Sequence, residues 1–191
     1  MQNIQIYLAS QSPRRRLLLR KMGISYQFFK PNISERIKTK NPRLLAVKLA
    51  QQKVVSVEQK IKQGIIIGVD TVVVINNRIL GKPKNKEDAR IMLNLLSGRK
   101  HRVISGIYIL QKPQYHSIKT SETTKVKFRI LKKQEIDKYL DSKEPYDKAG
   151  AYGIQGKAGF FVDEINGCYF NVVGLPITKL LKCLKIIKYN R

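Results

Sequence analysis

An aspartate lies in the middle of the most apolar run of this chain. Residues 65–76 are almost continuous in Ile and Val, a pattern typical of a strand that is buried on both faces. Asp70 interrupts this run. A buried carboxylate without a partner is costly, so Asp70 must lie beside a metal ion, beside a cation, or at the end of the strand. The run therefore predicts a central strand with a charged site on it. The alternative is a purely structural aspartate paired with Lys or Arg.

Strands and helices alternate along the rest of the chain, which indicates an α/β fold with a mixed sheet. At 191 residues the chain is expected to form a single domain, 1–191, with two lobes around a cleft. Beyond 65–76, we expect strands at 4–9, 25–29, 101–110 and 117–130, and a strand pair at 160–173 that turns at Asn166 and Gly167. Helices are expected to begin at Pro13, Pro42, Asn85, Lys132 and Pro176.

The apolar residues of two helices predict which faces are buried. Leu17, Leu18 and Leu19 supply the face of the first helix. Ile91 and Met92 belong to the face of the third.

The charge balance is strongly basic. Lys and Arg number 38 against 13 Asp and Glu, a formal net charge of +25. This excess indicates either a polyanionic partner or a bias toward Lys at harmless positions. Cys168 and Cys183 form no metal-binding pattern and are expected to be free thiols. No signal peptide is recognised, and the longest apolar run is too short for a membrane span. We expect a cytoplasmic protein.

The segment from Ser10 to Arg15 is a candidate anion site. A strand leads into a helix that has Ser12 at its N-cap and Pro13 in its first position. Such a helix start presents backbone N–H groups, and Arg14 and Arg15 add planar donors that suit phosphate oxygens. The alternative is a solvated basic first turn.

Three further features carry weaker signals. Lys82 lies between Gly81 and Pro83, which suits a fixed phosphate contact. The glycine loop, residues 147–156, lets backbone approach a ligand, and its Gln155 can both donate to and accept from a base. The alternative is a mobile surface loop. Glu35 is a second acid that could hold Mg²⁺ or Mn²⁺ together with Asp70.

Together these motifs resemble the Maf family of nucleoside triphosphate pyrophosphatases, and the resemblance runs from end to end. The matching segments are LASQSPRRRLLL (8–19), LAQQK (49–53), GVDTVVV (68–74), LGKPKNKEDARIMLNLLSGRKHRVISG (80–106), EPYDKAGAYGIQGKAGFFV (144–162) and INGCYFNVVGLP (165–176). The resemblance implies an elongated α/β fold with a central cleft, similar to inosine triphosphatase, and often a homodimer.

The resemblance also implies an activity: hydrolysis of a nucleoside triphosphate to the monophosphate and diphosphate with a divalent metal. It assigns Asp70 as the proton acceptor. It makes Arg14, Thr71 and Gln155 the specificity positions, a combination that resembles the subgroup acting on dTTP and UTP. Five more residues match positions that line the family's cleft. Four of them are implied to be phosphate contacts: Ser12, Arg15, Lys53 and Lys82. The fifth, Glu35, is implied to be a metal ligand together with Asp70.

Two alternatives remain open. One is the sister subgroup, which acts on 7-methyl-GTP and differs at the specificity positions. The other is a non-catalytic protein that binds nucleic acid or the division machinery through its basic surface. The basic residues are scattered, and the sequence shows no RNA-binding aromatic pattern or recognition helix. We therefore expect any affinity for nucleic acid to be weak and non-specific.

Overall fold

The computed structural model describes residues 4–34, 37 and 39–187. It forms a mixed α/β structure, as the sequence predicts, and separates into two compact units that are described in turn. Unit 1 comprises Met1–Asp70, Ser105–Glu122 and Gly174–Arg191, and unit 2 comprises Thr71–Ile104 and Thr123–Val173.

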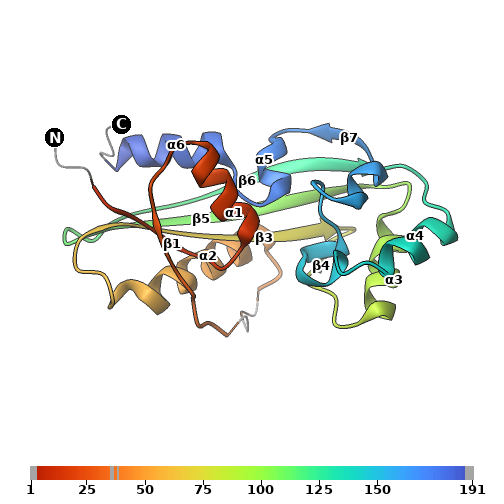
Figure 1. The fold of residues 1–191 in the computed structure, drawn as a ribbon, viewed down its shortest axis with the longest axis horizontal. Helices are drawn as coiled ribbons and strands as arrows, with labels where there is room; N and C mark the ends of the chain where they lie inside the picture. Colours follow the sequence, from red (N-terminus) through yellow and green to blue (C-terminus); the bar gives the residue numbers. More distant parts are fainter. Residues whose placement is uncertain (1–3, 35–36, 38, 188–191) are drawn as a thin grey trace. The chain divides into compact units, whose positions relative to one another are not determined.

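Seven strands pair in the order β2-β1-β3-β5-β6-β7, and β4 pairs with β3 (Figure 1). The strands are β1 (Ile6–Ala9), β2 (Gln27–Phe29), β3 (Gly64–Ile75), β4 (Arg78–Leu80), β5 (Lys100–Lys112), β6 (His116–Phe128) and β7 (Val162–Asn166). The helices are α1 (Pro13–Lys21), α2 (Pro42–Glu58), α3 (Lys86–Leu96), α4 (Lys133–Leu140), α5 (Tyr169–Val173) and α6 (Ile177–Ile186). Three short 3₁₀ turns are η1 (Pro145–Asp147), η2 (Ala149–Ala151) and η3 (Lys157–Phe161).

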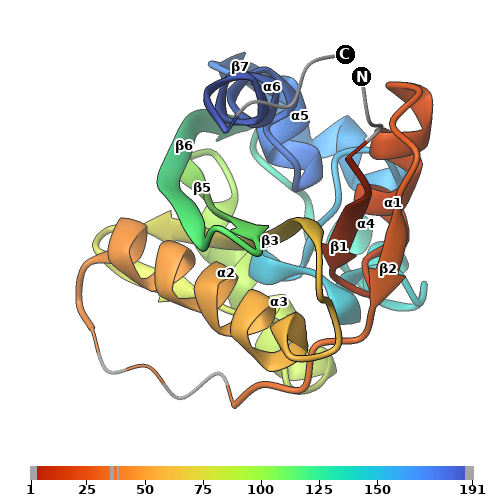
Figure 2. The same cartoon turned by 90° about the vertical axis from the view of Figure 1, so that its left-hand side faces the viewer.

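In unit 1, β1 is the parallel partner of both β2 and β3. The chain leaves β1 through α1 toward β2, and then returns through α2 to β3 on the other side of β1. The strand order therefore reverses between β1 and β3. Helices α2 and α6 lie on opposite faces of the part of β5 and β6 that belongs to this unit (Figure 2).

Two glycines let α2 approach the sheet closely. A Cβ on Gly68 of β3 would lie 2.2 Å from the backbone oxygen of Ala50. A Cβ on Gly106 of β5 would lie 2.2 Å from the backbone carbon of Ala46. Because Ala46 and Ala50 are one helical turn apart, the same face of α2 lies against both strands. This close packing fixes the height of α2 above the sheet.

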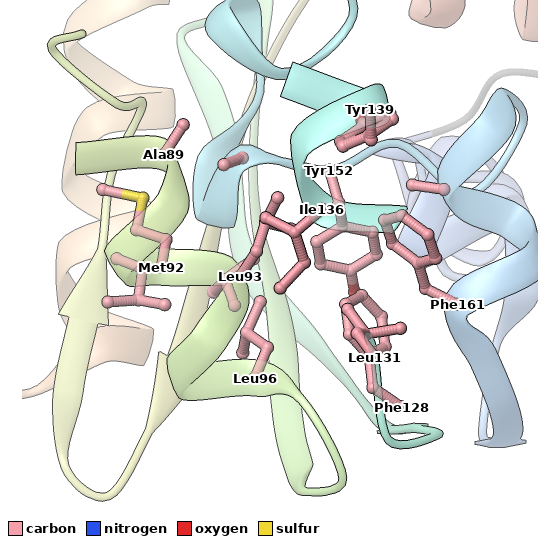
Figure 3. Close-up of a cluster of buried hydrophobic side chains, with 14 of the residues drawn as sticks. Ala89, Met92, Leu93, Leu96, Phe128, Leu131, Ile136, Tyr139, Tyr152 and Phe161 are labelled. Atoms are coloured by element: carbon pink, nitrogen blue, oxygen red, sulfur yellow. The ribbon is translucent and has the colours of Figure 1, made fainter. Parts of the chain in front are cut away.

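Unit 2 is built around a core that brings α3 and α4 together. Figure 3 shows Leu93 of α3 beside Ile136 of α4, and the aromatic rings of Phe128, Tyr152 and Phe161 grouped on the other side of Ile136. The helices begin where the local sequence predicts. Asn85 caps α3 by accepting from the N–H of Asp88, just as Asn41 of unit 1 caps α2. The turn before β4 places Asn76 and Asn77 at positive φ (48° and 62°), which suits a tight hairpin.

The expected strand pair at 160–173 is wrong in its second half. Strand β7 forms, but the chain then turns into α5. This helix carries the fully buried Asn171 inward, where its Nδ2 donates to the oxygen of Val103 and to Oγ1 of Thr124, each at 3.0 Å. These partners lie far away in the sequence, so local alternation could not reveal them.

Two residues that were expected on the buried faces of helices are exposed. Leu17 is 40% exposed and Ile91 is 58% exposed, although Leu18, Leu19 and Met92 are buried as expected. A helix buries only one stripe of its surface, so three consecutive leucines cannot all face inward. Cys168 and Cys183 are free thiols, as expected.

Candidate active site

Asp70 and Lys53 form an ion pair inside unit 1. The Lys53 ammonium donates to Oδ1 of Asp70 and, at 3.3 Å, to the carbonyl oxygen of Val69. The side chain of Lys53 is only 12% exposed and that of Asp70 only 13%. The close approach of α2 at Gly68 explains the pairing, because Lys53 follows Ala50 by one helical turn and is therefore held over the strand. The buried aspartate thus has a cationic partner, one of the alternatives that the sequence left open.

Arg15 is the second cation near this carboxylate. It is 9% exposed; its Nε donates to the Gly174 oxygen at 2.8 Å and its Nη1 to Oγ of Ser10 at 3.2 Å. Burial lowers the pKa of the guanidinium, while the charge of Asp70 raises it and that of Arg14 lowers it. Asp70 therefore compensates part of the cost of burying Arg15. Ser10 belongs to the segment that the sequence indicates, whereas Gly174 was not singled out, because nothing local marks it as a partner of an arginine.

The start of α1 has the form that the sequence predicts. Ser12 occupies the N-cap and Pro13 the first turn, and no acidic residue lies in that turn. The side chain of Ser12 makes no capping hydrogen bond, whereas its N–H donates to Oγ of Ser10 at 3.2 Å. The half-buried Arg14 follows directly. An uncapped helix start with two arginines and no carboxylate favours an anion.

The strand topology explains why these groups lie close together. Ala9, the last residue of β1, is the register partner of Gly68 in the parallel strand β3. Ser10 and the start of α1 follow β1 directly, and Asp70 follows Gly68 by two residues. In α/β proteins, ligands bind at the carboxyl ends of strands where the strand order reverses. The Asp70, Lys53 and Arg15 cluster occupies this position.

In unit 2, the glycine loop is joined to the end of β4. The N–H of Gly150 donates to the oxygen of Gly81 at 2.9 Å. Lys82 follows Gly81 and is exposed, as is Gln155 farther along the loop. Thr71, at the start of the β3 segment in this unit, is half-buried. The glycine loop and Lys82, which are separate motifs in the sequence, are therefore neighbours in the structure.

The glycine loop is held in place by two charged side chains that pack against its glycines. A Cβ on Gly153 would lie 2.6 Å from Cε of Lys148, and one on Gly156 would lie 2.0 Å from a carboxylate oxygen of Glu144. The Lys148 ammonium contacts Asp147 at 2.5 Å, and Glu144 accepts from the N–H of Lys157 at 3.1 Å. These contacts favour an ordered loop over a loose surface loop.

The described residues offer few ligands for a metal ion. Within residues 4–34, 37 and 39–187, no three His, Cys, Asp or Glu side chains gather in a way that could hold one. Asp70 is the acid placed at the site of unit 1, and Glu35 lies outside the described residues. A single carboxylate fits Mg²⁺ or Mn²⁺ if the ion arrives with phosphate oxygens and water as its other ligands, the arrangement common for Mg²⁺ with nucleotides. The donor set therefore fits an ion carried by the substrate.

The fold of this chain is similar to that of one solved structure. Over 96% of this chain and all of the other, the structure resembles the Staphylococcus aureus Ham1 protein, with a TM-score of 0.53 and 15% identity. This likeness shows a shared α/β fold. The family model described as Maf-like protein matches residues 5–187, and the chain belongs to that family.

Relatives at 45–49% identity have one name in common. A dTTP/UTP pyrophosphatase from Carboxydothermus hydrogenoformans is 48% identical over 95% of this chain and 98% of its own. Proteins of the same name from Alkaliphilus oremlandii (49% over 92% of both chains) and a Thermoanaerobacter strain (45%, 95% and 96%) are similar. In the described part of the chain, no helix combines the length and the apolar character needed to cross a membrane.

Proposed function

We propose that this chain hydrolyses dTTP and UTP to the nucleoside monophosphate and diphosphate. The observation that carries the proposal is the buried cluster of Asp70, Lys53 and Arg15 beside the start of α1, in a member of the Maf-like family. The names of the relatives support the choice of substrate. Attack of water on the α-phosphorus needs a base, and it needs cations that neutralise the phosphate oxygens.

Each group of unit 1 has a role in this reaction. Asp70 accepts the proton from the attacking water or holds that water in place. Lys53 orients the carboxylate through its contacts with Asp70 and the Val69 carbonyl oxygen. Arg14, Ser12 and the backbone at the start of α1 bind phosphate oxygens. Lys82, which the family resemblance makes a phosphate contact, would supply a further cation. Arg15 contributes positive charge to the phosphate site while its hydrogen bonds to Gly174 and Ser10 hold the backbone there.

A divalent cation, Mg²⁺ or Mn²⁺, completes the proposal. Asp70 would hold it, together with Glu35 and the phosphate oxygens. The ion would supply positive charge that favours departure of the diphosphate. The protein's own contribution is to place the carboxylate and the surrounding cations before the nucleotide binds.

Base selection is assigned to Gln155, with Thr71 and Arg14 shaping the choice. Thymine and uracil present the same O2, N3–H and O4 edge, and an amide can both donate and accept there. Cytosine presents an amino group and an unprotonated N3, which mismatches that pairing. A site built to pair with a polar group rejects a base that leaves it unpaired by ~100-fold or more. CTP, ATP and GTP should therefore be poor substrates.

The test is the nucleotide profile of Gln155→Glu. A carboxylate only accepts, so turnover of dTTP and UTP should fall by about 100-fold while the preference over CTP disappears. Gln134→Glu is the matched control, because Gln134 is an exposed glutamine on α4 of the same unit and receives the same change of charge. If both variants keep the parent's ranking, Gln155 does not select the base. If the parent prefers 7-methyl-GTP, the assignment to dTTP and UTP is wrong.

Two properties of the whole protein belong to this proposal. A cytoplasmic location agrees with two cysteines that are both free thiols, the state that a reducing compartment maintains. A homodimer follows from the family resemblance, and its mass in solution would test it.

A further inference from the structure

A buried histidine and a tyrosine of the glycine loop form a polar contact that the proposed chemistry does not use. Nε2 of His101 lies 2.8 Å from the hydroxyl of Tyr152. His101 is 2% exposed on β5, and Tyr152 is 6% exposed. A polar pair placed in an apolar core costs stability unless its partners satisfy each other, and a satisfied pair fixes the relative placement of its two side chains.

The aromatic ring of Phe128 packs against both partners of the contact. The ring of Phe128 lies 5.0 Å from that of His101 and 4.8 Å from that of Tyr152, both in edge-to-face geometry. Burial lowers the pKa of His101 to about 4, and burial raises the pKa of Tyr152. Both groups are therefore neutral at pH 7, where one partner donates a proton and the other accepts it. This hydrogen bond holds the phenol hydroxyl in place within the core.

The position of Tyr152 in the loop gives the contact its consequence. Gly150 and Ala151 adopt positive φ values of 70° and 60°, and the Gly150 N–H is bonded to the oxygen of Gly81. Tyr152 is the last buried residue before the chain emerges, and the exposed Gln155 follows three residues later. The His101 contact is therefore the last buried side-chain anchor before the residue assigned to base selection.

We propose that His101 and Tyr152 are positioning residues, which hold the glycine loop so that Gln155 meets the pyrimidine edge. The inference rests on the proposed function, because it gives Gln155 a base to select. It assigns to the unit 2 core a part in specificity as well as in stability. Neither residue touches the substrate; both act through the backbone between Tyr152 and Gln155.

Tyr152→Phe tests the proposal, because it removes the hydroxyl and keeps the ring. The control is Tyr139→Phe, a 3% exposed tyrosine of the same core that packs edge-to-face on Phe161 from α4, outside the loop. Amide hydrogen exchange of residues 153–157 is measured without nucleotide, and kcat and KM are measured for UTP and CTP. Exchange should quicken only in Tyr152→Phe. The UTP-to-CTP ratio of kcat/KM should fall by about 10-fold, since displacing a positioning group by ~1 Å can cost up to ~100-fold.

His101→Gln should repeat the Tyr152→Phe effects, and the double variant should add little to either change. The proposal is overturned if the two tyrosine variants exchange alike, or if exchange quickens while the UTP-to-CTP ratio stays at the parent's value. A parent that hydrolyses neither nucleotide would instead overturn the proposed function. The exchange measurement would still decide whether the anchor exists.

Discussion

Arg14 and Arg15 are neighbours in sequence but differ in what holds them. Arg15 is buried and hydrogen-bonded to Gly174 and Ser10, whereas Arg14 is half-buried. Arg15→Ala should lower the free energy of unfolding by roughly 1–3 kcal/mol, because the buried Gly174 oxygen loses the Arg15 donor and the Ser10 hydroxyl loses one of its two donors. Arg14→Ala should cost less stability, and its main effect should be a raised KM for triphosphates. Thermal unfolding and steady-state kinetics on both variants check this.

The contrast fails if the two alanine variants melt at the same temperature. It would then follow that the contacts of Arg15 contribute no more stability than those of Arg14. If Arg14→Ala raised the KM for the triphosphate and the inhibition constant of the bare nucleoside by the same factor, Arg14 would not be a phosphate contact.

The buried His101 makes stability depend on pH. Burial depresses the pKa of the folded histidine from 6.5 to about 4, so the unfolded chain binds a proton in this range and the folded chain does not. Stability is therefore complete above pH ~6.5 and is lost as the pH falls toward ~4. His101→Gln should lose less stability than the parent between pH 7 and pH 4.5, as measured by denaturant unfolding at each pH.

His116 provides the control for this measurement, because it is exposed on β6. His116→Gln should follow the parent at every pH. If His101→Gln also follows the parent, then His101 takes up its proton equally in the folded and unfolded chains, and its burial has no energetic consequence.

At the scale of elements, the contact between α2 and β3 holds the candidate site together. Gly68→Ala would place a Cβ 2.2 Å from the Ala50 oxygen and 2.7 Å from Cγ2 of Val54. We expect a loss of stability of ~1–3 kcal/mol and a fall in kcat, because α2 must move and carries Lys53 away from Asp70. Gly81→Ala is the stability control, since a Cβ there meets nothing within 4 Å. Equal melting temperatures for the two variants would contradict this account.

Element starts were predictable where a local signal sets them. Asn41, Asn85 and Pro13 mark the beginnings of α2, α3 and α1, because caps and N1 prolines act within one turn. Helix α5 was not predictable. It forms where Asn171 reaches Val103 and Thr124, and such long-range partners override the local alternation that favoured a strand.

The candidate site was predictable in part for the same reason. Asp70 stands out as a charge in an apolar run, and Ser12, Arg14 and Arg15 stand out at a helix start. The ion pair of Asp70 with Lys53, and the bonds of Arg15 to Ser10 and Gly174, depend on how α2 and the chain before α6 pack. Residue types and their spacing do not reveal those contacts. Gly68 is the sequence feature that could have indicated the close approach of α2.

At the scale of the whole molecule, the net charge of +25 exceeds what a nucleotide site needs. Many acids are already engaged: Asp141, Asp137, Asp163 and Glu135 pair with Lys86, Arg90, Lys127 and Arg129 in unit 2. Such exposed pairs contribute little stability each. An affinity for nucleic acid that rests on this charge would fall steeply as the salt concentration rises. Hydrolysis of a nucleotide at the specific site of unit 1 would depend less steeply on salt.

The most direct test of the central claim is diphosphate release by the parent and by Asp70→Asn, with Mg²⁺ or Mn²⁺, over dTTP, UTP, CTP, ATP, GTP and 7-methyl-GTP. The parent should release diphosphate mainly from dTTP and UTP. Asp70→Asn should reduce turnover by ~10²–10⁴-fold, the contribution of a general base. Because the variant leaves Lys53 without its carboxylate, its melting temperature must lie above the assay temperature. A folded Asp70→Asn that retains the parent's turnover, or a parent that releases orthophosphate instead, would contradict the account.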